Sequence, residues 1–173
     1  MIHVYQGDGK GKTTAAFGMA LRAVAAGWQV LIVQFLKDGT SGEARMLAAY
    51  PNVTLLSAGP AAKFTCAMSE QDRAAARAAH DANLAQAARL AEEGACDLLV
   101  LDEVAAALRE GLLDEGPLRP LLARAAGNPA FELVATGRKP PRLLLEQADY
   151  VTDMRCERHP AARGVRAREG VEL

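Results

Sequence analysis

The sequence lacks the features that mark several classes of protein. Its three cysteines, Cys66, Cys96 and Cys156, are odd in number and far apart, and they form no C-x-x-C pair. Zinc and redox signatures are therefore absent, and the simplest interpretation is reduced thiols in a cytoplasmic protein. No apolar run approaches the roughly 20 residues of a membrane span. No leader precedes the apparent strand at Ile2–Gln6, so we expect neither export nor a membrane partner.

A strong net charge is also absent. The 173 residues carry a formal net charge of −1, so charge does not indicate a nucleic-acid partner, and we expect none. Half of the residues are hydrophobic, which suffices for the core of one domain of this length. The C-terminal end differs, because five arginines and only one acid lie between Arg155 and Arg168. We interpret residues 155–173 as a basic, solvated tail.

Strand and helix patterns alternate along the chain. Short apolar runs predict strands at residues 2–5, 30–33, 53–56, 98–101 and 131–135, and 150–152 follow the last helix. Helical patterns occupy about residues 13–26, 43–49, 69–93, 117–126 and 142–147. Ser69, with acids in the next turn, predicts the start of the longest helix. This alternation predicts an α/β fold of three layers, with a mostly parallel sheet and helices on both faces.

A glycine-rich loop stands between the first strand and the first helix. It reads GDGKGKT, and only three residues separate Gly7 from Gly11, whereas the usual phosphate loop, G-x-x-x-x-G-K-[ST], has four. Its glycines, which include Gly9, let neighbouring N–H groups face an anion, and the helix N-terminus adds its dipole. We therefore predict a P-loop NTPase-like fold, with residues 1–173 as a single P-loop-type nucleotide-binding domain that includes the basic tail 155–173.

The loop also supplies side chains for a nucleotide. Lys12 would place its ammonium on the phosphates, and Thr13 would offer its hydroxyl to Mg²⁺. Asp8 is unusual inside such a loop, because a carboxylate repels phosphates. We expect it to point away, to cap a turn or to meet a nucleoside hydroxyl, while Lys10 offsets its charge.

Other polar residues follow the buried strands. Asp102 and Glu103 come directly after the apolar run at residues 98–101, and Arg138 follows the strand at 131–135. Ligands of open parallel sheets bind at the carboxyl ends of the strands, and an acid there often holds Mg²⁺ in phosphate-loop sites. Two alternatives stay open, because a buried strand can end in an acid without a metal, and Arg138 can be an ordinary surface residue.

The sequence offers no well-placed histidine as a general base. His3 falls in a strand, His80 in the long helix and His159 in the tail, and we expect structural or exposed roles for all three. A hydrolase or kinase needs a base or a group that positions water, for which Glu103 is a candidate. A triphosphate site without a base fits a reaction whose nucleophile needs no deprotonation.

Six segments, in order, resemble one family. They are Gly7–Ala16, Val33–Lys37, Leu99–Glu103, Thr136–Arg138, Ala148–Met154 and Gly164–Glu172. Together they resemble the phosphate-loop ATP:corrinoid adenosyltransferases of cobalamin synthesis and salvage, whose loop has the same shortened form. The resemblance covers nearly the whole chain. It implies transfer of the 5′-deoxyadenosyl group of ATP to cobalt(I) of a corrinoid, with release of triphosphate.

The resemblance also implies roles for individual residues. Lys12 and Glu103 are the expected catalytic residues, and Mg²⁺ or Mn²⁺ is expected on Thr13, Asp102 and Glu103. The expected contacts to ATP or the corrinoid are Gly7, Asp8, Gly9, Lys10, Gly11, Lys12, Thr13, Thr14, Arg22, Arg138 and Phe64. For Arg22 a solvent-exposed place on the first helix is an equal alternative. The expected partners are ATP, a reduced corrinoid, a reducing flavoprotein and a second copy of the chain in a homodimer.

One segment departs from the family. Better-known members carry Phe-Thr-Trp before the long helix, and its aromatics close over the lower corrin face. Here Phe64 matches, but Cys66 replaces the second aromatic. Either Met68 or a neighbouring chain fills the gap, or the substrate lacks a strong lower ligand. Two other functions stay open on the same scaffold: a small-molecule kinase, which would release ADP, and a nucleotide-dependent switch.

Overall fold

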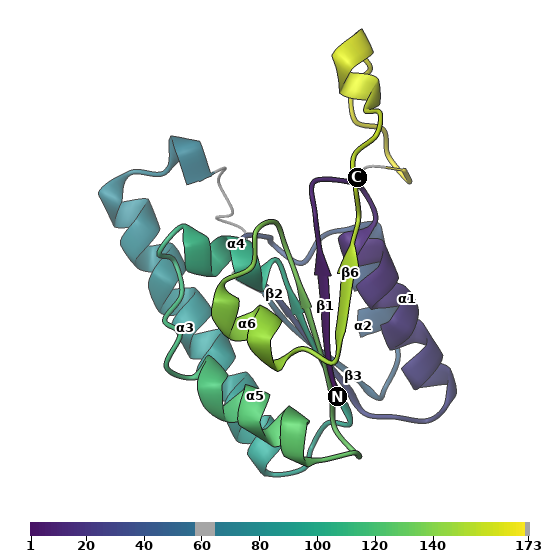
Figure 1. The fold of residues 1–173 in the computed structure, drawn as a ribbon, viewed down its shortest axis with the longest axis vertical. Helices are drawn as coiled ribbons and strands as arrows, with labels where there is room; N and C mark the ends of the chain where they lie inside the picture. The colour runs from purple at the N-terminus through teal and green to yellow at the C-terminus, as the bar shows by residue number, and fades with distance from the viewer. Residues whose placement is uncertain (58–64, 172–173) are drawn as a thin grey trace.

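A six-stranded parallel sheet forms the centre of the molecule. The computed structural model describes residues 1–57 and 65–171. Within these ranges the strands are β1 (Ile2–Gln6), β2 (Val30–Gln34), β3 (Val53–Ser57), β4 (Leu98–Asp102), β5 (Glu132–Thr136) and β6 (Tyr150–Asp153). Their order is β3-β2-β4-β5-β1-β6, and all five pairings are parallel. The carboxyl ends of all described strands therefore lie at one edge of the sheet (Figure 1).

Helices cover both faces of this sheet (Figure 1). On one face lie α1 (Lys12–Ala25) and α2 (Gly42–Ala48). On the other lie α3 (Glu70–Glu92), α4 (Val104–Arg109), α5 (Leu118–Gly127) and α6 (Arg142–Gln147). Short 3₁₀ turns occur at η1 (Thr65–Ala67) and η2 (Pro160–Arg163). The three-layer α/β fold predicted from the sequence is confirmed.

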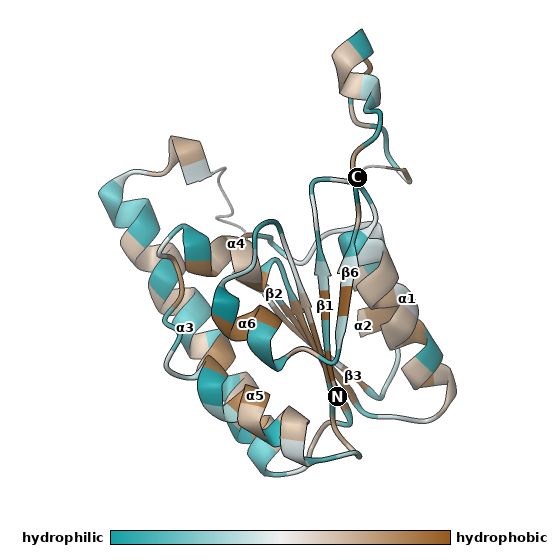
Figure 2. Cartoon of the chain, in the orientation of Figure 1, coloured by the Kyte–Doolittle hydropathy of each residue, from teal (hydrophilic) through white to brown (hydrophobic). Residues whose placement is uncertain are grey.

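The central strands are apolar because they are buried on both faces. Neighbouring residues of one strand point to opposite sides of a sheet, so β2, β4 and β5 contribute to two cores at once. Ile32, Val100 and Val134 pair across these strands and pack against α1 and α2. Leu99 and Leu133, one position away, pack against the helices of the other face. Figure 2 shows these strands as the most hydrophobic part of the chain.

The predicted elements occur close to their predicted bounds, with one omission. The long helix α3 begins after Ser69, whose hydroxyl accepts a hydrogen bond from the N–H of Asp72, while the Asp72 carboxylate accepts from the N–H of Ser69. The sequence predicted Ser69 as the cap with acids in the first turn, and the structure adds the reciprocal hydrogen bond of a capping box. Helix α4 was not predicted. It follows β4 almost at once, and its N-cap Glu103 makes no capping hydrogen bond through its side chain, so the sequence carries no start signal there.

The basic C-terminal segment lies outside the sheet. After β6 the chain leaves the carboxyl edge and extends away from the helices (Figure 1). Residues 155–171 include η2 and are almost entirely exposed, and so are the five arginines of the tail. No helix within residues 1–57 and 65–171 combines the length and the apolar character needed to cross a membrane.

Candidate nucleotide site

The phosphate loop lies between β1 and α1 at the carboxyl edge of the sheet. Gly7 and Gly11 adopt φ angles of +104° and +116°, which L side chains rarely allow. Gly9 is needed for a different reason, namely close packing. A Cβ atom on Gly9 would lie 2.6 Å from the carbonyl oxygen of Met154 and 2.7 Å from that of Arg155. The loop is therefore closed on one side by the backbone that follows β6.

One amide of the loop already has a partner. The N–H of Gly9 donates to the carbonyl of Met154, at 2.6 Å, so this amide is engaged within the protein. The side chain of Lys12 spans the loop from the helix side. Lys12 is only 8% exposed, and its buried Nζ atom donates to the carbonyl oxygen of Gly9 at 2.8 Å. Burial lowers the pKa of Lys12, and the nearby Glu103 carboxylate opposes this shift.

Asp102 is the centre of a buried polar network. It ends β4, is fully buried and accepts four hydrogen bonds. Its Oδ1 atom accepts from the hydroxyls of Thr13 and Thr136, each at 2.8 Å. Its Oδ2 atom accepts from Gln34 Nε2 at 3.1 Å and from Lys37 Nζ at 2.7 Å. The carboxylate thus joins the start of α1 to the ends of β2 and β5.

This network limits what Asp102 can bind. A carboxylate offers about four lone-pair sites, and four donors already use them, so a metal ion would have to displace one donor to bind Asp102 directly. The Thr13 hydroxyl donates to Asp102 and accepts from Lys37 Nζ at 3.1 Å. The Oε1 atom of Gln34 is buried and has no hydrogen-bond partner among the described residues. A buried acceptor beside the network suits a water molecule or a ligand hydroxyl.

Glu103 differs from its neighbour Asp102. It is only partly buried and lies in the left-handed region at φ 62°, and its N–H donates to the Thr136 hydroxyl at 2.8 Å. Its effect on the pKa of Lys12 places its charge near the ammonium. Together with the Thr13 hydroxyl it provides hard oxygen ligands of the kind that Mg²⁺ prefers. Within the described ranges, no group of three or more His, Cys, Asp and Glu side chains forms a metal site by itself.

Strained backbone gathers at this edge. Leu36, Glu103 and Lys139 have φ angles of 58°, 62° and 50°, and they are the non-glycine residues with positive φ in the described part of the chain. Each follows the carboxyl end of a strand, β2, β4 or β5. Such conformations cost about 1–3 kcal/mol each and cluster at functional sites.

Asp8 and Arg138 join two loops of the site. The Nε atom of Arg138 lies 3.6 Å from Oδ1 of Asp8, and both side chains are well exposed. The partner of Asp8 is thus Arg138, whereas Lys10 was expected to offset its charge. The pair brings the loop after β5 to the phosphate loop. Lys10 and Thr14 are exposed at the same edge.

These features match a known family. A family model described as "ATP:corrinoid adenosyltransferase BtuR/CobO/CobP" covers residues 1–173. The chain belongs to that family. The corrinoid adenosyltransferase of Pseudomonas aeruginosa is 37% identical over 176 residues, which span 100% of this chain and 83% of that protein. The corresponding proteins of Salmonella typhimurium and Escherichia coli K12 are 35% and 34% identical, over 99% of this chain and 85% of each relative.

Of the residues expected at the site, Arg22 is not brought to it, and Phe64 cannot be placed from the described residues. Arg22 lies exposed in the last turn of α1, about 15 Å along the helix axis from Lys12 at the usual rise per residue. It takes the alternative place that the sequence left open. Phe64, the predicted corrinoid contact, lies outside the described residues. Cys66, which replaces the second aromatic of the family, is exposed in η1.

Three residues of the Asp102 network were not predicted as site residues. Gln34 and Lys37 follow the apolar run of β2, and Thr136 ends β5. The signal that identified Asp102, a polar residue at the end of a buried strand, applies to Gln34 and Thr136 but not to Lys37, which comes after Phe35 and Leu36. What the sequence did not show is the strand order, which places β2 and β5 on either side of β4.

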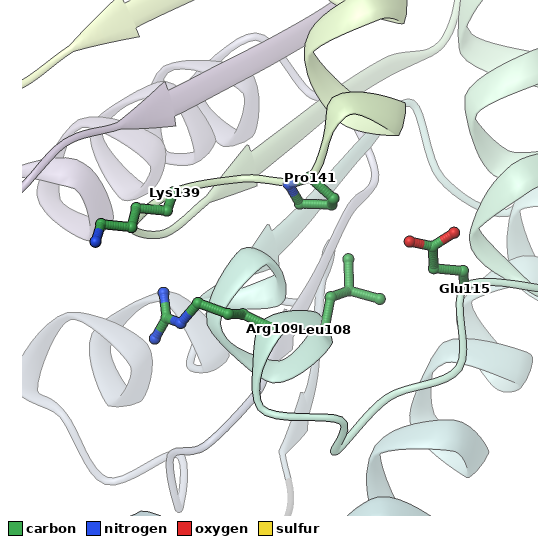
Figure 3. Close-up of a pocket in the computed structure, with 5 residues that line it drawn as sticks. All are labelled: Leu108, Arg109, Glu115, Lys139 and Pro141. Atoms are coloured by element: carbon green, nitrogen blue, oxygen red, sulfur yellow. The ribbon is translucent and has the colours of Figure 1, made fainter.

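A small pocket lies beside the loop that follows β5, next to Arg138 in the sequence. Leu108, Arg109, Glu115, Lys139 and Pro141 line it, and Figure 3 shows Arg109 and Lys139 extending along one side while Glu115 lies across from them. The guanidinium of Arg109 also donates to the carbonyl of Arg138 at 2.8 Å. This contact anchors the backbone of the Arg138 loop to α4.

Proposed function

We propose that this chain transfers the 5′-deoxyadenosyl group of ATP to cobalt(I) of a corrinoid at the carboxyl edge of its sheet, and that the loop from Gly7 to Thr13 holds the departing triphosphate. The observation that carries the proposal is the buried Lys12 ammonium, held across the loop next to the Asp102 network. A buried cation near a closed backbone loop is suited to an anionic leaving group.

The reaction forms a bond between cobalt and the 5′ carbon and breaks the bond between that carbon and the triphosphate oxygen. Cobalt(I) supplies the electron pair, and the triphosphate leaves with the pair of the broken bond, so no proton has to be removed from the nucleophile. In the described residues His3 pairs with Glu132, and the ring nitrogens of His80 are both engaged with backbone groups. The protein's tasks are then to align the reactants and to neutralise the leaving group.

Lys12 is the first residue that we propose to neutralise the negative charge of the triphosphate. In the structure its Nζ atom donates to Gly9, and we propose that it exchanges this carbonyl for phosphate oxygens when ATP binds. Arg138 stands at the exposed rim of the loop, paired with Asp8, and we propose that it contacts the nucleotide there. The remaining loop residues Gly7, Gly11, Lys10 and Thr14 contribute amides and polar groups around the phosphates.

We also propose that Mg²⁺ accompanies the triphosphate. The Thr13 hydroxyl and the Glu103 carboxylate are the oxygen ligands that the chain offers, and the saturated Asp102 supports Thr13 from behind. Mg²⁺ would neutralise part of the triphosphate charge. Glu103 has this role in place of a general base, since the reaction needs none.

The proposal extends to the oligomeric state of the enzyme, its location and its electron donor. We propose a homodimer, because β6 forms an edge of the sheet and Tyr150 and Val151 are 52% and 49% exposed on it. Sedimentation of the purified chain would test this. We further propose a cytoplasmic enzyme that receives its electron for cobalt(II) from a reducing flavoprotein, and whose residues 1–173 act as one nucleotide-binding domain with a basic tail.

The decisive experiment follows both products at once. Purified protein, Mg-ATP and chemically reduced cobalamin are mixed without oxygen, and the light-sensitive cobalt–carbon product and free triphosphate are measured. We expect one triphosphate for each adenosylated corrinoid. Release of ADP and phosphate in place of triphosphate would instead identify a kinase or a switch, which the family match does not favour.

A further inference from the structure

Lys37 reaches the nucleotide site through an unusual turn. β2 ends at Gln34, and the N–H of Phe35 still donates to the carbonyl of Asp102 at 2.9 Å, as in the sheet. The next residue, Leu36, has the left-handed φ of 58°, which a bulky side chain seldom adopts. Immediately after this turn, Lys37 places its ammonium on Asp102 and on the Thr13 hydroxyl.

A histidine from another layer holds this turn. His80 of α3 is 1% exposed, and its Nε2 atom accepts a hydrogen bond from the N–H of Leu36 at 3.1 Å. Its Nδ1 atom lies 2.9 Å from the carbonyl oxygen of Leu112, and its ring meets that of Phe35 edge-on at 5.5 Å. An N–H can only donate and a carbonyl can only accept, so Nδ1 carries the proton and Nε2 is free to accept.

Each ring nitrogen of His80 therefore has one defined role, Nδ1 as donor and Nε2 as acceptor. Without the Nε2 acceptor, the N–H of Leu36 would lose its partner in a partly buried position, and an unsatisfied buried donor costs about 1–3 kcal/mol. The left-handed conformation of Leu36 has a cost of similar size, so the turn would then relax toward an extended backbone. Such a change would redirect the side chain of Lys37, which is 31% exposed and bound to a carboxylate with no exposure at all.

We propose that His80 is a positioning residue of the nucleotide site, and that it acts through the Leu36 turn to hold Lys37 on Asp102 and Thr13. Lys37 in turn cancels the charge of Asp102 and orients the Thr13 hydroxyl, so that the triphosphate meets a neutralised carboxylate. This inference rests on the proposed function only in that the loop binds the triphosphate.

A double-mutant cycle on the full chain tests the connection. The variants are His80→Asn, which keeps a donor for Leu112 but does not reach Leu36, Lys37→Met, and the two combined. ATP affinity is measured by titration calorimetry. We expect each single change to weaken ATP binding by about tenfold or more, and the double variant to bind about as well as Lys37→Met alone, because residues that act in one chain are not additive.

Matched variants separate positioning from folding. Leu84→Ala removes another buried side chain of α3, and it should lower the unfolding midpoint while leaving ATP affinity within about twofold of the wild type. His80→Gln offers an amide oxygen to the Leu36 N–H, so this conservative variant should keep ATP affinity closer to that of the wild type than His80→Asn does. Should His80→Asn not fold, His80→Phe, which keeps a ring but offers no acceptor, replaces it in the cycle. A loss of ATP affinity in His80→Asn that vanishes in the Lys37→Met background supports the proposal. A loss that persists in that background overturns it.

The outcomes also distinguish this inference from the proposed function. Lys12→Ala is titrated in the same way. If Lys12→Ala binds ATP normally, the loop is not the triphosphate site and the proposed function fails. If Lys12→Ala loses ATP affinity while the losses of His80→Asn and Lys37→Met add, or Lys37→Met has no effect, only the positioning role of His80 is overturned.

Discussion

Lys12 is the residue on which the proposed chemistry depends most directly. Its Nζ atom is buried against the loop carbonyl of Gly9. Replacing Lys12 by Ala should lower turnover well over tenfold, because one charged contact to a leaving group is often worth about 2–4 kcal/mol. Initial rates of cobalt–carbon bond formation at saturating ATP would measure the loss. Arg89→Ala, which removes an exposed charge in the last turn of α3, is the matched control. Near-normal turnover of Lys12→Ala would remove Lys12 from the proposed role.

Gly9 is required by packing and not by an unusual φ angle. Gly9→Ala would place a methyl group 2.6 Å and 2.7 Å from two backbone oxygens that cannot move as side chains do. We expect a loss of about 1–3 kcal/mol in the free energy of unfolding, as for other overpacked sites, and weaker ATP binding. Urea denaturation measures the first effect and calorimetry the second.

A second glycine provides the control for this change. Gly18 lies inside α1, and a Cβ atom there would meet nothing within 4 Å. Gly18→Ala should therefore stabilise the protein by about 0.5–1 kcal/mol, the usual advantage of Ala over Gly in a helix. If both variants lose similar stability, close packing of the loop against residues 154–155 is not the reason for Gly9.

For single residues, the sequence predicted the place of those in the phosphate loop and at strand ends. It did not predict which side chains from different strands contact each other. The placement of Thr13 beside Asp102 was predicted, because a recognisable loop and a strand end imply a shared edge. The roles of Gln34, Lys37 and Thr136 were not, since their contacts with Asp102 depend on which strands are neighbours. The pairing of Asp8 with Arg138 was not predicted either, because it depends on β1 and β5 being neighbours in the sheet.

Helix α3 shows how an element can be predicted from its first turn. Its Ser69 and Asp72 exchange side-chain hydrogen bonds with each other's backbone N–H, at 3.2 Å and 3.0 Å. Ser69→Ala should lower the free energy of unfolding by about 0.5–2 kcal/mol, the usual cost of losing an N-cap. Urea denaturation measures this change.

Helix α2 offers the comparison within the same chain. Its N-cap Ser41 accepts from the N–H of Ala44 at a longer distance, 3.4 Å, and the reciprocal half of a capping box is not among its described contacts. Ser41→Ala should therefore cost less stability than Ser69→Ala. The opposite order would mean that the capping geometry does not control the stability contributed by these helix starts.

Helix α4 shows why one element was missed. Its six residues, VAAALR, follow β4 with only Glu103 between them, and four of the six are buried. The left-handed backbone of Glu103 turns the chain from strand to helix, so no polar cap or glycine separates the two elements. Tertiary packing against β5 and the Gly137 backbone, not a local start signal, determines this helix.

At the scale of the whole molecule, the alternation of elements predicted the layers but not the strand order. The sheet places β4 between β2 and β5 and puts β1 next to β6. As a result, polar residues at the ends of β2, β4 and β5 converge on the phosphate loop and the start of α1. The spacing of the apolar runs does not distinguish this order from others, because β2, β4 and β5 are all buried over nearly their whole length.

His80 should make the free energy of unfolding of the whole protein depend on pH. Burial lowers the pKa of this imidazole, and the Leu112 carbonyl and the charge of Asp81 oppose the shift. In the unfolded chain His80 takes up a proton as the pH falls through about 6.5, whereas in the folded protein it does so only at lower pH. The free energy of unfolding should therefore be fully supported above about pH 6.5 and should fall below it, by at most about 1.4 kcal/mol per pH unit from this group.

Other groups also titrate in this range, so the test compares the wild type with His80→Asn. Urea denaturation of both proteins at several values between about pH 7.5 and 5 gives two stability profiles, and titrations common to both cancel in their difference. Because only the wild type loses the contribution of a neutral buried imidazole on acidification, the stability advantage of the wild type should shrink as the pH falls. Parallel profiles would mean that His80 takes up its proton equally in the folded and unfolded states, which the buried pair of contacts to Leu36 and Leu112 does not permit.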